Sequence, residues 1–267
     1  SLLTSKMKVQ DIISILEAIA PSHLQESYDN AGLIVGDPAT EVTGILFCLD
    51  STESVVEEAL ALGCNLVVAH HPIVFRGLKR FNGSSYVERT IMQAIRKNVA
   101  IYAIHTNLDN VYRQGVNAKI AEKLGLLDTR ILLPKPGQTE IGAGMLGFLP
   151  EAMNETTFLQ HVKSALHVSC VRHTALRQKP VRTVAVCGGS GSFLLSDALR
   201  AGADAFVTAD FKYHEFFDAE GRLVIADIGH YESEQFTIEL LYEIIREKFP
   251  TFALHCTKVN TNPVHYL

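Results

Sequence analysis

The chain has 267 residues, of which 47% are hydrophobic and 20% are charged, as in an ordinary globular protein. Its formal net charge of -5 gives no basic footprint of the kind that nucleic-acid-binding proteins carry, so a nucleic-acid partner is not expected. No apolar run reaches the roughly 18 residues of a transmembrane helix, so no membrane partner is expected either.

The first elements in chain order alternate between helix and strand. Apolar residues at helical or strand spacing, bounded by polar residues, glycine and proline, define each of them. The predicted elements are a helix at 8–20, a loop and short strand at 26–36, a strand at 44–49, a helix at 53–62 with Ser51 or Thr52 as its N-cap, a strand at 65–69, a helix at 85–98, a strand at 99–104 and a helix at 115–124. Strands separated by helices at a spacing of roughly 30 residues indicate βαβ units and a largely parallel sheet.

A region rich in proline and glycine, residues 132–144, predicts a boundary in the second half of the chain. After it the same α/β pattern returns. The predicted elements are a helix at 155–166, a strand at 183–186, a glycine-rich turn at 188–191, a helix at 193–201, strands at 205–208 and 223–228, and a helix from about 232 to 249.

The cysteines and the N-terminus point to a reducing compartment. The five cysteines are widely spaced and form no CxxC motif, so we expect free thiols in a cytoplasmic protein. Residues 1–6 lack the apolar core of a signal peptide and are interpreted as a non-native extension before Met7.

The most informative residues are His70 and His71, which end a buried strand directly before Pro72. Side chains just past the carboxyl end of a strand in an open α/β sheet project into the crevice where ligands bind. A second strand end carries His105 and Asp109. Histidine side chains at these strand ends are better suited to binding a metal than to packing in an apolar core.

A third strand end carries Asp227, His230 and Glu234. Because His230 and Glu234 are four residues apart where a helix begins, they share one face of it and can reach one centre together. The competing interpretation is that each histidine is a hydrogen-bonded surface or core residue and that this pair is a solvated helix face. The coincidence of three such strand ends favours a metal site.

Histidines combined with carboxylates are donors for zinc, iron, manganese, cobalt or nickel. Consecutive side chains such as His70 and His71 tend to diverge, so two ions could each take one. Asp109 is our candidate for the carboxylate that bridges two ions about 3.5–4 Å apart.

Three further segments have two interpretations each. The Gly-Gly-Ser-Gly turn at 188–191 could hold a phosphate on its backbone N–H groups or could be a tight turn for close packing. Asp210, Lys212 and His214 could line the crevice as acid, base or substrate clamp, or belong to a solvated loop. The basic residues within 76–80 could bind a phosphate or could simply be solvated.

Six motifs in order resemble those of the Nif-three-like family, often labelled GTP cyclohydrolase I type 2 homologues, and the resemblance covers residues 7–267. The motifs are Ser-Tyr-Asp-Asn-Ala-Gly-Leu at 27–33, Ala-His-His-Pro-Ile-Val-Phe at 69–75, His-Thr-Asn-Leu-Asp-Asn at 105–110, Cys-Gly-Gly-Ser-Gly at 187–191, Thr-Ala-Asp-Phe-Lys-Tyr-His at 208–214 and Gly-His-Tyr-Glu-Ser-Glu at 229–234.

The resemblance implies two similar, intertwined α/β lobes with mixed, largely parallel sheets. We expect residues 7–128 with 222–267 in the first lobe and 129–221 in the second, in the short form that lacks an inserted domain. It also implies a toroidal homohexamer and two divalent metal ions per chain. The family pattern places the metal ligands at His70, His71, Asp109, His230 and Glu234.

Two functions of different classes follow as hypotheses. The first is a metal-dependent hydrolase for a small nucleotide-like or phosphorylated substrate, including GTP cyclohydrolase-type chemistry. His105, Lys212 or His214 would then be the catalytic residues that orient substrate or move protons. The alternative is a non-catalytic metal-binding scaffold or regulatory protein-interaction partner.

Overall fold

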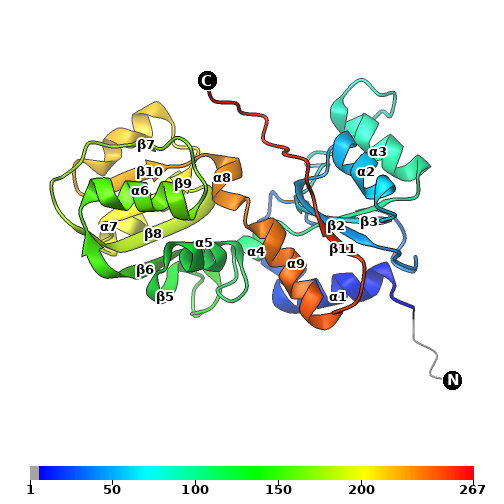
Figure 1. The fold of residues 1–267 in the computed structure, drawn as a ribbon, viewed down its shortest axis with the longest axis horizontal. Coiled ribbons are helices and arrows are strands. Elements are labelled where there is room, and N and C mark those ends of the chain that lie inside the picture. Colours follow the sequence, from blue (N-terminus) through cyan, green and yellow to red (C-terminus); the bar gives the residue numbers. More distant parts are fainter. Residues whose placement is uncertain (1–5) are drawn as a thin grey trace. The chain divides into compact units, whose positions relative to one another are not determined.

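The protein, described by a computed structural model over residues 6–267, divides into two compact units (Figure 1). Unit 1 comprises the described residues up to Leu108 together with Thr237–Pro263. Unit 2 comprises Asp109–Phe236 and Val264–Leu267. The greater part of the predicted N-terminal extension, residues 1–5, lies outside the described residues.

Unit 1 is built on a five-stranded sheet with the order β1-β4-β3-β2-β11. The strands from β4 to β11 are parallel to one another, and β1 pairs antiparallel with β4 at one edge. The strands are β1 (Gly32–Val35), β2 (Ile45–Asp50), β3 (Leu66–His71), β4 (Ala100–Ala103) and β11 (Leu254–Cys256). The helices are α1 (Val9–Ile19), η1 (Ser22–Leu24), α2 (Glu53–Ala61), α3 (Tyr86–Arg96), α4 (Thr106–Asp109, whose last residue belongs to unit 2) and α9 (Thr237–Lys248).

Unit 2 is built on a six-stranded sheet with the order β5-β6-β8-β9-β10-β7. Its central strands β8, β9 and β10 are parallel, whereas the remaining pairs are antiparallel. The strands are β5 (Leu127–Pro134), β6 (Gly142–Met153), β7 (Arg172–His173), β8 (Val181–Ser190), β9 (Ala205–Ala209) and β10 (Val224–Asp227). The helices are α5 (Val116–Leu124), α6 (Glu155–Ala165), η2 (Ser192–Leu194), α7 (Leu195–Arg200), η3 (Tyr213–Ala219) and α8 (His230–Glu234).

Several helices begin and end where their sequences provide caps. The hydroxyl of Thr52 accepts a hydrogen bond from the backbone N–H of Val55 at the start of α2, and Ser85 does the same for Glu88 at the start of α3. Gly125 ends α5 in the left-handed conformation, with φ 74°, which glycine adopts without steric cost. These local signals explain why α2, α3 and α5 were predicted to within a few residues.

The predicted fold class, mixed α/β with two mixed sheets, is confirmed, although parallel pairing predominates only in unit 1. The proline- and glycine-rich region that we interpreted as a boundary is the connection between the antiparallel strands β5 and β6. The helix expected at 232–249 is two helices, α8 and α9.

The division of the chain follows strand pairing. Residues 222–236 lie in unit 2 because β10 pairs with β9 and β7. Residues 109–128 also lie there because α5 packs on β8 and β6. The sequence had grouped both segments with the first lobe.

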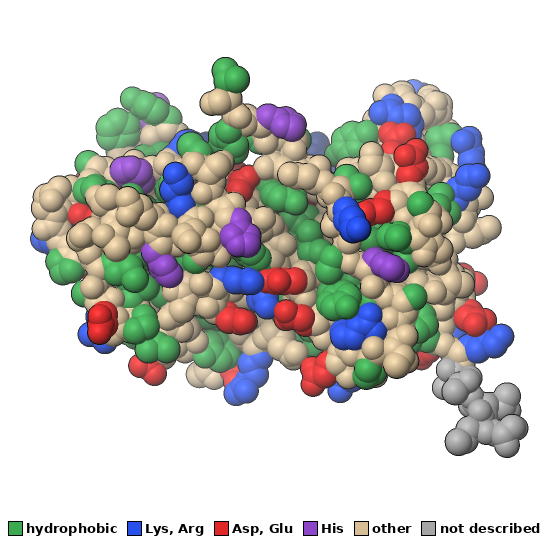
Figure 2. Space-filling model, in the orientation of Figure 1, with side chains coloured by type: hydrophobic (Ala, Val, Ile, Leu, Met, Phe, Trp, Pro, Cys, Tyr) green, Lys and Arg blue, Asp and Glu red, His purple; other side chains and the backbone are tan. Residues whose placement is uncertain are grey.

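Two surface properties bear on function. Within residues 6–267, no helix combines the length and the apolar character needed to cross a bilayer. On the face drawn in Figure 2, basic and acidic side chains are interspersed and form no continuous basic surface.

Candidate metal centre

Three histidines gather at the carboxyl edge of the parallel sheet in unit 1. His70 and His71 are the last two residues of β3, and His105 follows the neighbouring strand β4. The ring centroids are 4.9 Å apart for His70 and His71, 5.2 Å for His70 and His105, and 5.3 Å for His71 and His105. One ring nitrogen of each lies within 4.8 Å of the others, so this histidine cluster could hold a metal ion. The consecutive histidines therefore converge, contrary to our expectation that they diverge.

Every ring in the histidine cluster has its Nδ1 atom held by an oxygen acceptor. Because a carbonyl or carboxylate oxygen accepts and does not donate, each Nδ1 carries the hydrogen of this bond. Histidines that bind metals are held in this way. The acceptors, each 2.8 Å from Nδ1, are the backbone oxygen of Ile104 for His70, Oδ1 of Asp50 for His71 and Oδ1 of Asp29 for His105.

The Asp29 carboxylate is buried and tightly held. Burial alone would raise the pKa of Asp29, but hydrogen bonds from His105 and Thr106 outweigh burial and hold this pKa well below its usual range. Thr106 donates both its backbone N–H, at 2.9 Å, and its hydroxyl to Oδ2 of Asp29. Asp29 is therefore a fixed anion that orients the His105 ring.

The Asp50 carboxylate is held from the C-terminal segment of unit 1, because the hydroxyl of Thr261 donates to its Oδ2 atom at 2.7 Å. We predict that Thr261→Val weakens zinc binding about tenfold, the lower end of the effect of losing an outer hydrogen bond. The measurement is competition with a coloured chelator. Thr257→Val is the matched control, since the Thr257 hydroxyl bonds Glu58 instead. Equal zinc affinity in the Thr261 variant and the wild type would refute the support role.

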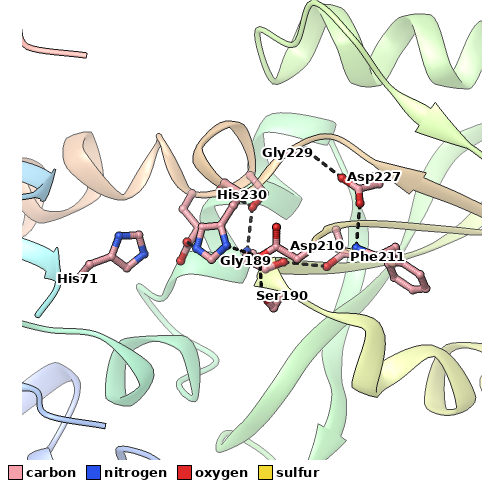
Figure 3. A network of polar contacts seen from close by, with 12 residues as sticks. His71, Gly189, Ser190, Asp210, Phe211, Asp227, Gly229 and His230 are labelled. Atoms are coloured by element: carbon pink, nitrogen blue, oxygen red, sulfur yellow. Dashed lines mark hydrogen bonds and ion pairs between the residues drawn. The ribbon is translucent and has the colours of Figure 1, made fainter. Parts of the chain in front are cut away.

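Unit 2 brings together three other predicted ligands, Asp109, His230 and Glu234, which we term the α8 cluster. His230 and Glu234 occupy the first and last positions of α8, and Nε2 of His230 lies 2.5 Å from Oε1 of Glu234. Nδ1 of His230 donates to Oδ2 of Asp210 at 2.6 Å, and the hydroxyl of Ser190 donates to the same oxygen (Figure 3). An oxygen of Asp109 lies within 4.8 Å of one of Glu234.

The charges of the α8 cluster act on its surroundings. Burial, together with the carboxylates of Asp109 and Glu234, raises the pKa of the Cys187 thiol, which therefore stays neutral. The Glu234 side chain is only 2% exposed. Two carboxylates this close and this poorly solvated repel each other, and a divalent cation would stabilise both. Imidazoles of fixed tautomer together with carboxylates form a donor set that fits zinc, iron, manganese, cobalt or nickel.

Comparison with known protein families matches residues 7–263 to the family described as Duf34/NIF3 (NGG1p interacting factor 3). The chain belongs to the DUF34/NIF3 family. It is 36% identical over 243 residues to a Clostridium perfringens protein named GTP cyclohydrolase 1 type 2 homolog, with 91% of this chain and 92% of that protein covered. The resemblance seen in the sequence is thus confirmed.

Solved structures agree with this DUF34/NIF3 assignment. A Bacillus cereus protein related to NIF3 superposes with a TM-score of 0.89 at 28% identity, covering 98% of this chain and 99% of the other. Staphylococcus aureus protein SA1388 gives a TM-score of 0.90 at 29% identity, covering 98% of this chain and 99% of the other.

In this DUF34/NIF3 chain the glycine-rich turn serves packing. The N–H of Gly188 donates to Asn117 at 2.9 Å and that of Gly189 to Ser233 at 2.8 Å, so both already have acceptors within unit 2. A Cβ atom on Gly189 would lie 3.3 Å from both Glu234 and His230. Residues 188–190 are the end of β8 and not a separate turn, so only the close-packing part of the tight-turn interpretation fits, since glycine lets β8 approach the α8 cluster closely.

Asp227, a ligand candidate at the third strand end, has a structural role. Its carboxylate accepts hydrogen bonds from Arg172 at 2.7 Å and from the backbone N–H groups of Phe211 and Gly229 at 2.9 and 3.1 Å (Figure 3). These bonds fix the loop after β9 and the start of α8. Asp227 therefore shapes the site without belonging to the donor set.

Lys212 and His214 are both exposed and make local contacts within η3. The backbone N–H of Lys212 donates to Glu215 at 2.7 Å. The His214 ring packs against Tyr213 and Phe217, with centroids 5.0 and 6.1 Å apart. Their side chains are accessible to a ligand, but they hold none of the metal-ligand candidates.

Sequence reasoning missed the carboxylates that hold the histidine rings: Asp29 and Asp50 were given no role, and Asp210 was considered as an acid or base. A signal for Asp50 was present, because it ends β2 directly opposite His71 in the parallel register. Asp210 likewise follows β9, which pairs with the strand that precedes α8. Residues at the ends of neighbouring strands can therefore indicate the supporting carboxylates as well as the ligand candidates.

Proposed function

We propose that this protein is a metal-dependent hydrolase with a dinuclear centre held by His70, His71, Asp109, His230 and Glu234. The observation that carries the proposal is that Nδ1 of each of these histidines is held by an oxygen acceptor, as in histidines that bind metals. Of these residues, His70 and His71 belong to unit 1, and Asp109, His230 and Glu234 belong to unit 2.

When bound, two divalent ions supply a Lewis acid and an activated water at neutral pH. The protein's own residues hold the donors in place, with Asp50 and Asp210 orienting His71 and His230. Lys212 and His214 are accessible and are our candidates for orienting substrate or moving a proton.

The substrate class we propose is a small nucleotide-like or phosphorylated molecule, in keeping with the name of the relative from Clostridium perfringens. The loop after His71 presents groups suited to it. In this loop Phe75 is 49% exposed and the next residue, Arg76, is also exposed, and the ring of Tyr28, 63% exposed, lies 6.3 Å from that of Phe75 between centroids. Aromatic faces stack on bases and guanidinium groups bind phosphates.

The test is turnover of GTP, other nucleotides and phosphomonoesters by metal-stripped protein reloaded with each of the five metals in turn. We expect product with at least one metal, and its loss in Asp109→Asn. Asp128→Asn, an exposed aspartate in the same unit, is the matched control. No turnover of any substrate with any metal would count against the hydrolase.

The alternative is a non-catalytic scaffold or regulatory partner, and one observation favours it. The helix η3 exposes Tyr213 by 72% and Phe217 by 64%, which is much aromatic surface for a protein without partners. Metal binding without turnover, together with a defined assembly, would support this function. The proposed assembly is a homohexamer, testable by sedimentation, and the proposed location is the cytoplasm.

A further inference from the structure

We propose that a pocket on unit 2 binds a planar aromatic carboxylate, with Arg172 holding the carboxylate group and the exposed rings of η3 holding the aromatic ring. The pocket is lined by β7 and the segment after it, and by η3 and the turn after it. Its volume is about 560 Å³, which is in the range of small-molecule sites. The inference goes beyond the proposed function, because none of the metal-ligand candidates lines this pocket.

Arg172 is positioned by the sheet and by a buried carboxylate. In the antiparallel pairing of β7 with β10, Arg172 lies opposite Asp227. Nη2 of Arg172 donates to Oδ2 of Asp227 at 2.7 Å and to the backbone oxygen of Phe211 at 3.0 Å. Within residues 6–267 both hydrogen bonds of this side chain use Nη2, so Nε and Nη1 keep N–H groups for an acceptor on a ligand. The side chain is 56% exposed, so a ligand can reach these groups.

Aromatic rings line the pocket beside this guanidinium group. The Cζ atom of Arg172 lies 5.2 Å from the centroid of the half-buried Phe216 ring, within the range of a cation–π contact. Tyr213 and Phe217 are mostly exposed, and their ring centroids are 5.6 Å apart with the planes inclined at 72°. Aromatic rings stabilise a further ring through offset-stacked or edge-to-face contacts. A planar aromatic ligand would therefore cover apolar surface that otherwise faces water.

The charges around the pocket favour an anionic ligand over a cationic one. A guanidinium group repels an ammonium ligand but forms charge-assisted hydrogen bonds with a carboxylate. Asp227, which pairs with Arg172, is only 3% exposed. Its carboxylate also accepts from the backbone N–H groups of Phe211 and Gly229, so its charge is shared among several donors (Figure 3). Glu220 also lines the pocket, but it is exposed, so water and salt screen its charge.

The test is a fluorescence titration of the full-length protein with 2-naphthoate, whose emission can be followed directly because the chain contains no tryptophan. We expect saturable binding that is at least about tenfold tighter than for the neutral analogue 2-naphthylmethanol, as for a hydrogen bond to a charged group. In Arg172→Gln this preference for the carboxylate should disappear. The matched control is Arg200→Gln, because Arg200 is an exposed arginine of unit 2 that is likewise paired with an aspartate. Comparing two ligands within each variant separates the loss of this contact from any general effect on the fold.

The aromatic side of the pocket has its own variant. Phe217→Ala should weaken 2-naphthoate binding about fivefold through the loss of ring contacts. Phe193→Ala is the matched control, since Phe193 is 63% exposed against 64% for Phe217 and does not line the pocket. The proposal is overturned if 2-naphthoate does not bind saturably, which would leave the rings of η3 for a protein partner, or if the wild type shows no preference for the carboxylate. It is also overturned if neither Arg172→Gln nor Phe217→Ala changes the affinity, because the probe would then bind elsewhere, including at a metal ion.

Discussion

Asp109→Asn is expected to lower the affinity for at least one metal ion by more than about 100-fold, the upper end of the effect of outer-shell changes. The substitution preserves shape but removes the negative charge from the carboxylate that we assign as the bridge. Because the same charge lies close to Glu234, the metal-free variant should be no less stable than the wild type.

The measurement combines elemental analysis with a zinc competition titration, and thermal melting of the metal-free proteins checks the fold. Asp128→Asn serves again as the control for removing a charge from unit 2. Full metal content in the Asp109 variant would show that the ligand assignment is wrong.

Glu155→Ala is expected to cost about 3 kcal/mol of unfolding free energy in unit 2, in the range for breaking a buried ion pair. Glu155 and Arg177 are only 4% and 6% exposed, and Nε of Arg177 donates to Oε2 at 2.9 Å. Burial would raise the pKa of Glu155, but hydrogen bonds from the Arg177 side chain and from the backbone of Arg177 and Gln178 lower it below its usual value. The alanine variant leaves a buried guanidinium without its main partner.

Urea unfolding of the metal-free protein measures this loss. Glu151→Ala, an exposed glutamate near the end of β6, is the matched control and should change stability by less than about 0.5 kcal/mol. The loss of unfolding free energy for Glu155→Gln, which keeps the shape of the side chain, should lie between the losses for Glu151→Ala and Glu155→Ala. A loss below about 1 kcal/mol for Glu155→Ala would mean that the pair behaves like an exposed one.

Much of unit 1 could be predicted from the sequence because its signals are local. The side chains of Thr52 and Ser85 cap the starts of α2 and α3, and buried apolar runs form β2 and β3. The β5–β6 hairpin was missed because the glycines and prolines of a long hairpin connection look like those of a linker. The division into units depends on which strands pair, and pairing between distant segments leaves no local pattern.

The ligand candidates were identified from the sequence, whereas the carboxylates that support them were not. His70, His71 and His105 stand at strand ends, where chemistry is expected in an α/β sheet. The carboxylates that hold His71 and His105 come from elsewhere in the chain, with Asp29 lying 76 residues before the His105 that it orients. A spacing rule finds residues on one helix face, as it did for His230 and Glu234. A contact between residues as far apart in the sequence as Asp29 and His105 is visible only in the fold.

The central claim, that these clusters hold metal, is tested most directly by metal content per chain. The protein would be purified without chelator or nickel affinity resin and analysed for zinc, iron, manganese, cobalt and nickel. We predict about two ions per chain. No bound metal, even after incubation with zinc, manganese and iron, would contradict the account and leave the histidines with a structural role.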